Sequence, residues 1–152
     1  MRSSFQLDQG VSVIADGKYY DLHNCFDFVG YEHRPAEKKL RLEWLRSPGE
    51  WVSADIPVGL VLFFEGVTNF AVQKRDGDMP FTEDNCVSNI SFLPPELSDR
   101  YDAMCPDHRS HDEHLSLSFQ SGASMKIWAE SVTHQSKSAE PRRPENNAWD
   151  VT

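Results

Sequence analysis

The chain has 152 residues, of which 39% are hydrophobic and 26% are charged, and its formal net charge is −9. This length and composition predict one globular domain that is large enough to bury a core without disulfides. A strongly acidic surface repels phosphate backbones, which argues against nucleic-acid binding, and it attracts basic proteins.

The N-terminus and the cysteines indicate the compartment. The segment Met1 to Asp8 has no apolar stretch of the kind found in signal peptides, and no apolar segment approaches the length of a membrane span. The three cysteines, Cys25, Cys86 and Cys105, are odd in number and widely spaced. The sequence therefore predicts free thiols, a cytoplasmic location and no membrane partner.

The first half of the chain has the pattern of short antiparallel strands. Asp16-Gly17 separates two strand-like segments, 11–15 and 18–22, and this dipeptide favours a two-residue type I′ hairpin turn. Aromatic and β-branched residues predict another strand over 26–31. Apolar and charged residues alternate along 40–44, which predicts a strand with one buried face.

The second half of the chain contains its most apolar run, Val58 to Phe64. Both faces of such a strand are apolar, so we expect it to lie centrally and to be covered on each side. Return strands are expected over 70–72 and 90–93. A closing hairpin is expected over 115–129, where alternation predicts one buried face on each strand.

One short helix is expected near residues 95–104, because proline suits a first helical turn. From Thr133 onward the alternation stops, and we predict a mobile polar tail over 133–152 after a single domain over 1–132. The predicted fold is mainly β, with a β-rich α+β fold as the alternative. It is an antiparallel meander of about seven to nine short strands that forms a curved sheet, a sandwich or a partial barrel.

A cluster of potential zinc ligands recurs at every third residue: Cys105, His108, His111 and His114. Thiolate and imidazole are good zinc donors, and four of them can close a tetrahedral site. No second ligand pair lies at a zinc-motif spacing elsewhere, so a histidine-rich polar loop is favoured over a zinc site. We therefore expect no cofactor, with zinc as the alternative.

The segment 76–84 is acidic and begins like a calcium-binding loop. Pro80 interrupts that pattern, and the central glycine and terminal glutamate of an EF-hand are missing. We therefore expect an acidic loop that presents charge to a basic protein partner. The candidate partner-binding residues are Asp76, Asp78, Glu83 and Asp84.

The aromatic residues suggest a second kind of site, because aromatic-rich antiparallel sheets often form apolar ligand pockets. The candidate pocket residues are Tyr20, Phe28, Trp44 and Trp128. Catalytic fingerprints are lacking: the sequence has neither a Gly-x-Ser-x-Gly motif nor a glycine-rich phosphate loop. His23 and Cys25 are close in sequence, but catalytic groups are assembled in space, so no catalytic residue is assigned.

Three segments carry a resemblance: 60–67 (LVLFFEGV), 75–80 (RDGDMP) and 114–122 (HLSLSFQSG). Together they resemble small, uncharacterised bacterial β-proteins, some of which are found near polymorphic toxins and are regarded as immunity proteins. The likeness covers roughly residues 10 to 131 and implies a bacterial cytosolic protein that binds and blocks a partner. It supplies no catalytic residues.

Three functions therefore follow from the sequence. The acidic charge and the missing catalytic motifs favour a non-enzymatic interaction protein that binds a basic partner. The alternatives are a small-molecule-binding β domain with an aromatic-lined pocket and a metal-binding protein that uses the Cys105 to His114 cluster.

Overall fold

The computed structural model describes residues 1–100 and 112–137. Within them the protein is mainly β, as predicted, with twelve strands in three sheets. Three short 3-10 turns are the helical segments of this part, at η1 (Pro35–Glu37), η2 (Phe81–Glu83) and η3 (Pro95–Leu97). In the part described, no helix has the length and apolar character needed to cross a membrane.

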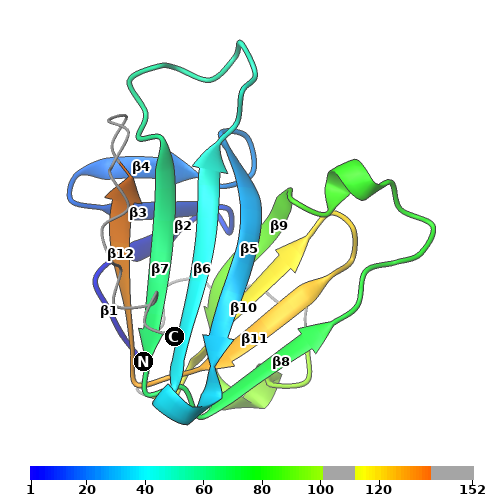
Figure 1. The fold of residues 1–152 in the computed structure, drawn as a ribbon. Helices are drawn as coiled ribbons and strands as arrows, with labels where there is room; N and C mark the ends of the chain where they lie inside the picture. Colours follow the sequence, from blue (N-terminus) through cyan, green and yellow to red (C-terminus); the bar gives the residue numbers. More distant parts are fainter. Residues whose placement is uncertain (101–111, 138–152) are drawn as a thin grey trace.

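The largest sheet has five strands in the order β1-β12-β7-β6-β5 (Figure 1). Their bounds are β1 (Arg2–Ser3), β12 (Ser131–Lys137), β7 (Gly59–Glu65), β6 (Lys39–Arg46) and β5 (Phe26–Arg34). β7 is the central strand, which confirms the prediction for the most apolar run. Its inward side chains are fully buried, and Val61 on the opposite face is only 2% exposed.

The second sheet has four antiparallel strands in the order β8-β11-β10-β9. They are β8 (Asn69–Gln73), β11 (Ser124–Trp128), β10 (His114–Phe119) and β9 (Val87–Leu93). Figure 1 shows this sheet running obliquely away from the five-stranded sheet, so that the two diverge and do not close into a barrel. β5 and β8 are their outer strands on the open side.

The third sheet contains β2 (Gln6–Asp8), β3 (Ser12–Ala15) and β4 (Lys18–Asp21), and it lies behind the five-stranded sheet in Figure 1. β3 and β4 are joined by the predicted hairpin turn. Asp16 and Gly17 have φ values of 51° and 71°, the positive values that a type I′ turn requires.

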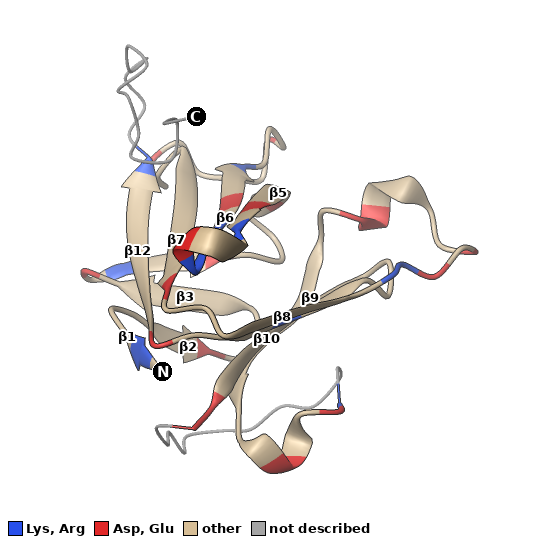
Figure 2. Ribbon diagram, turned by 60° about the horizontal axis from the view of Figure 1, so that its bottom comes forward, with Lys and Arg blue, Asp and Glu red and all other residues tan. Residues whose placement is uncertain are grey.

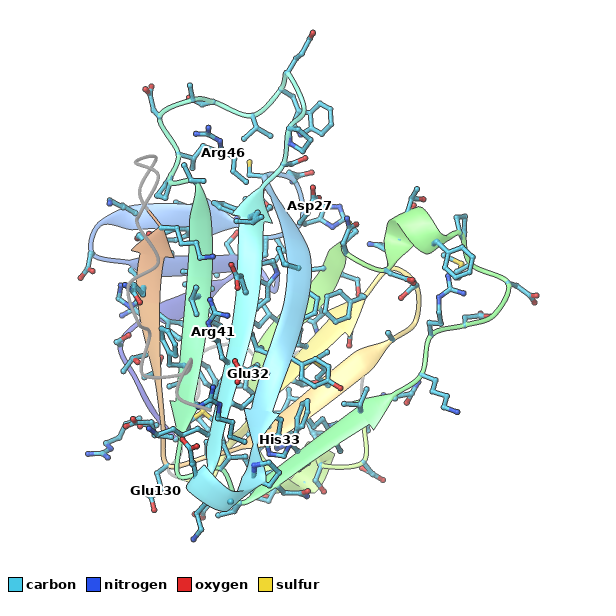
Figure 3. The ribbon with its side chains drawn as sticks, viewed as in Figure 1. Asp27, Glu32, His33, Arg41, Arg46 and Glu130 are labelled. Carbon is cyan, nitrogen blue, oxygen red and sulfur yellow. The ribbon has the colours of Figure 1, made fainter. Side chains whose placement is uncertain are left out.

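A single hydrophobic core joins the inner faces of the three sheets. Phe28 of β5 and Phe119 of β10 place their ring centroids 4.9 Å apart, which links the two larger sheets. Tyr20 of β4 contacts Phe26 of β5 at 5.8 Å, which links the small sheet. Charged residues lie on the other side of the five-stranded sheet, where Figure 3 shows Arg41 and Glu32.

The chain ends differ from the sequence prediction. β12 continues to Lys137, so residues 133–137 belong to the domain and not to a polar tail. Seven residues of β12 pair with β7, and this ladder holds a polar sequence that has little buried surface of its own. Together with β1 and β2, β12 raises the strand number to twelve. Residues 138–152 lie outside the described residues.

Two further differences concern the segment before β10. The helix expected near 95–104 is a 3-10 turn at Pro95–Leu97, and residues 101–104 lie outside the described part. The hairpin of β10 and β11 was expected to bury one face. Every residue of β10 is instead buried, and on β11 Ser124 and Lys126 are buried as well.

Candidate functional site

The acidic loop, defined here as residues 74–86, joins β8 to β9 and brings together all four predicted partner-binding residues. Asp76 and Asp78 are exposed, while Glu83 and Asp84 are half-buried. Figure 2 shows this loop projecting beyond the end of the four-stranded sheet, with the ribbon of its acidic residues in red. The four residues therefore lie on one loop, where two of them are accessible to a partner.

Arg75 holds the acidic loop together from within. Its Nε donates to Asp84 Oδ1 over 2.7 Å, and its Nη2 donates to the backbone oxygen of Met79. Its guanidinium carbon lies 4.5 Å from the centroid of the Phe81 ring, a distance typical of a cation–π contact. One cation thus fixes three points of the loop.

The acidic loop is also tied to the turn between β10 and β11. The backbone N–H of Asp76 donates to the oxygen of Ser121, and that of Ser121 donates to the oxygen of Glu83. The N–H of Gln120 donates to the oxygen of Cys86. These hydrogen bonds give the loop a defined conformation although half of its side chains are exposed.

Large exposed apolar side chains are found on the acidic loop and on the outer strands of the two larger sheets. We call them the apolar edge: Val29 and Tyr31 of β5, Val72 of β8 and Phe81 of the acidic loop. Phe81 is 80% exposed. Tyr31 packs edge-on against Phe70 of β8 at 5.2 Å, so the apolar edge spans the open side between the two larger sheets.

The outer strand β5 offers backbone groups as well as side chains. A β-bulge at Val29 interrupts its pairing with β6. Phe28 lies opposite Trp44 and Gly30 lies opposite the adjacent residue Glu43, so Val29 is the extra residue between two consecutive pairs. The N–H of Phe28 points away from β6 and donates to the oxygen of Asn85. β5 has no strand on its free side in the part of the chain that the structure describes.

The four predicted pocket residues do not form one pocket. Tyr20 and Trp44 are fully buried in the core, and Phe28 packs against Trp44 at 5.1 Å. Trp128 lies on the other face of the four-stranded sheet, where it borders a cavity of about 500 Å³ together with Arg2 and Glu113. The structure therefore brings Phe28 and Trp44 together and separates Trp128 from them.

The face that carries Trp128 is polar but buried, which alternation alone did not predict. The imidazole of His114 stacks on the Trp128 ring at 4.5 Å, and its Nε2 lies 3.0 Å from the ammonium of Lys126. Lys126 also donates to the backbone oxygen of Leu97. Because Lys126 donates to Nε2, the neutral imidazole carries its proton on Nδ1, and this atom has no hydrogen-bond partner among residues 1–100 and 112–137.

Burial shifts the acid–base equilibria of this pair. Desolvation, with a smaller effect of the Lys126 charge, lowers the pKa of His114 to about 4. Desolvation also lowers the pKa of Lys126, while the charge of Asp99 acts in the opposite direction. Alternation is the one sequence signal for this pair, because it puts both residues on the polar face of the hairpin.

The zinc prediction falls mostly outside the described residues. Cys105, His108 and His111 are in the segment 101–111, and His114 is the one member whose surroundings are known. Its Nε2 already accepts the Lys126 hydrogen bond. In the two described ranges, no three histidine, cysteine or acidic side chains are grouped so that they could hold a metal ion.

His23 meets a cysteine in space, but this cysteine is Cys86 and not the nearby Cys25. Cys86 Sγ lies 3.5 Å from His23 Nδ1, while the same Nδ1 lies 2.6 Å from the backbone oxygen of Val87. A carbonyl oxygen can only accept, so Nδ1 carries a proton and cannot take one from the thiol. Burial raises the pKa of the Cys86 thiol, and the negative charges of Glu83 and other carboxylates raise it further. This pair does not have the arrangement of an activated nucleophile.

Comparisons with protein-family models, with curated proteins and with solved structures found no match to this chain.

Proposed function

We propose that this protein is a non-enzymatic binding protein that recognises a basic protein partner through the acidic loop and the apolar edge. The observation that carries the proposal is Phe81, an aromatic ring that is 80% exposed yet held in place by Arg75. A large aromatic side chain at a fixed exposed position is typical of the residues that dominate binding energy at protein interfaces.

The surroundings of Phe81 fit a basic partner. Asp76 and Asp78 are exposed on the same loop, and the chain as a whole has a net charge of −9. Carboxylates around an apolar centre attract a basic surface over distances of about 10 Å at 0.1 M salt and so accelerate encounter. The apolar edge then supplies the surface that is removed from water.

Preorganisation supports the same conclusion. The acidic loop is fixed by the Arg75 contacts and by the backbone hydrogen bonds to the β10–β11 turn. A loop that is ordered before binding loses less conformational entropy when the complex forms. A binding protein of this kind, located in a bacterial cytoplasm and acting by blocking its partner, is what the resemblance to immunity proteins implies.

The test uses two loop variants and one control in full-length protein. Phe81→Ala removes the ring, and Asp78→Lys with Glu83→Lys reverses two charges whose side chains have no hydrogen-bond or ion-pair partner in the described part of the chain. The control, Glu50→Lys with Glu65→Lys, makes the same change of charge at exposed positions outside the loop. Each immobilised protein is exposed to an extract of the native host.

We expect one basic protein to be retained by the wild type and by the control and to be lost with both loop variants. Once the retained basic partner has been purified, Phe81→Ala should weaken its complex with the chain by about 2 kcal/mol, or roughly 30-fold in Kd. The charge reversal should slow association and flatten its dependence on salt. The proposal is wrong if the loop variants and the control retain the same proteins, or if association rates do not change across a salt series.

A further inference from the structure

A second cavity lies at the opposite end of the five-stranded sheet from η1, under the segment that joins β6 to β7. This segment, residues 47–58, is called the roof loop here. The cavity has a volume of about 620 Å³, within the usual range of small-molecule sites. In Figure 3 the side chain of Arg46 lies beneath the arch of this loop.

The roof loop is held in a defined position over the cavity. Arg46 Nη1 donates to the backbone oxygens of Ala54 and Ile56, over 3.0 Å and 2.9 Å. At the other side of the loop, Trp51 Nε1 donates to the oxygen of Asn24. The Trp51 ring lies directly over Gly49, where a Cβ would collide with it. These contacts within the chain hold the roof loop in place, so no ligand is needed to form the cavity.

The charges around this cavity are opposite in sign to those of the whole chain. Lys18, Arg46 and Lys137 border it, against one carboxylate, Asp55. Lys137 contacts Glu43, whereas Lys18 forms no ion pair in the part of the chain that the structure describes. A protein with a net charge of −9 thus has a cavity with an excess of positive charge.

The rest of the lining is suited to a flat apolar body. The exposed ring of Tyr19 borders the cavity, and so do Ile56 and Pro57 of the roof loop. Ser136 adds a hydroxyl group to the border. The geometry points to a binding site for a small organic anion, an aromatic carboxylate or phosphate, with its charged group near Lys18 and Arg46 and its ring against Tyr19 and Ile56.

The test is a titration of ¹⁵N-labelled full-length protein followed by NMR, with four probes. Benzoate and phenyl phosphate carry both a ring and a charge, inorganic phosphate carries the charge alone, and benzyl alcohol carries the ring alone. We expect benzoate or phenyl phosphate to bind with a Kd on the order of 1 mM, as fits a ligand of about ten heavy atoms. The shifted amides should be those of residues 18–19, 46, 53–56, 58 and 136–137.

A pair of matched variants tests the role of charge. Lys18→Gln should weaken the binding of the preferred anion roughly tenfold, because a charge-assisted contact is lost. Lys74→Gln, which makes the same change at an exposed position in the acidic loop, should leave it unchanged. The two aromatic anions distinguish a carboxylate site from a phosphate site.

Four results would overturn the inference: no saturable shifts at the cavity with either aromatic anion, equal binding of benzyl alcohol, equal binding of inorganic phosphate, or equal weakening by both lysine variants. The site is independent of the proposed protein interaction, because the cavity shares no lining residue with the acidic loop or the apolar edge. Phe81→Ala should leave the anion titration unchanged, so the two proposals fail separately.

Discussion

Acidification should destabilise this protein through one buried imidazole. His114 is fully buried, and its pKa is lowered to about 4 in the folded protein, against about 6.5 in an unfolded chain. Because the folded pKa is the lower one, the stabilisation is present above pH 6.5 and is lost as the pH falls from there towards 4. At 1.36 kcal/mol for each unit of difference, the loss is on the order of 3 kcal/mol.

The physical cause lies in the contact with Lys126. The neutral ring accepts a hydrogen bond from the ammonium at Nε2. Protonation would place an N–H donor and a second positive charge against that ammonium in a region without water access. Lys126 acts with the same sign, since burial lowers its pKa and its contribution to stability falls as the pH drops below 10.5.

The measurement compares the wild type with His114→Gln, whose amide oxygen can still accept a hydrogen bond from Lys126. The free energy of unfolding is obtained from urea titrations followed by circular dichroism between about pH 7 and pH 4.5. The difference in the free energy of unfolding between the wild type and the variant should fall by about 2 kcal/mol as the pH is lowered across this range. Two pH profiles that stay parallel would refute the reasoning, because the carboxylates that also titrate there are common to both proteins.

Three further predictions concern packing, thiols and metal. Gly59→Ala should destabilise the protein by about 1–3 kcal/mol in urea titrations, because the added Cβ would lie 2.7 Å from a backbone oxygen of β6. The control Gly77→Ala, whose added Cβ meets nothing within 4 Å, should change the free energy of unfolding by less than about 0.5 kcal/mol. Equal effects of the two substitutions would contradict this prediction. Cys86 should react with iodoacetamide roughly tenfold more slowly than glutathione at pH 7, because the raised pKa of its thiol leaves less thiolate. Site-resolved mass spectrometry measures this rate, and a rate equal to or faster than that of glutathione would be inconsistent with the surroundings of Cys86. Chelation should leave the melting temperature of the untagged protein unchanged, because Nε2 of His114 already accepts a hydrogen bond from Lys126. One bound zinc ion per chain, with a lower melting temperature after its removal, would restore the metal hypothesis.

Local sequence signals predicted most of the strands. The Asp16-Gly17 turn depends on backbone conformations that glycine adopts readily, and it forms as expected. The apolar run of β7 has no polar face to expose, so it could only be central. β12 gave no such signal, because its polar residues become a strand through pairing with β7, which is an interaction distant in sequence.

Alternation failed on β10 for a related reason. It correctly separated Leu115 and Leu117 from Ser116 and Ser118, but it cannot tell whether the polar face meets water or another part of the chain. Leu97 supplies its backbone oxygen to Lys126 on that face. A buried lysine is rare enough that a solvent-exposed position was the natural prediction.

The same distinction between local and distant contacts decides how much of the candidate sites the sequence reveals. The carboxylates of the acidic loop are neighbours in sequence, so they were identified together, and Phe81 lies among them. Val29 and Val72 belong to the apolar edge only because β5 and β8 are the outer strands on the open side of two sheets. The roof-loop cavity is an extreme case, since Lys18, Arg46 and Lys137 come from three separate strands. Positive charges that are scattered in an acidic sequence look like ordinary surface residues, and they become a site only when the strand order places them around one cavity.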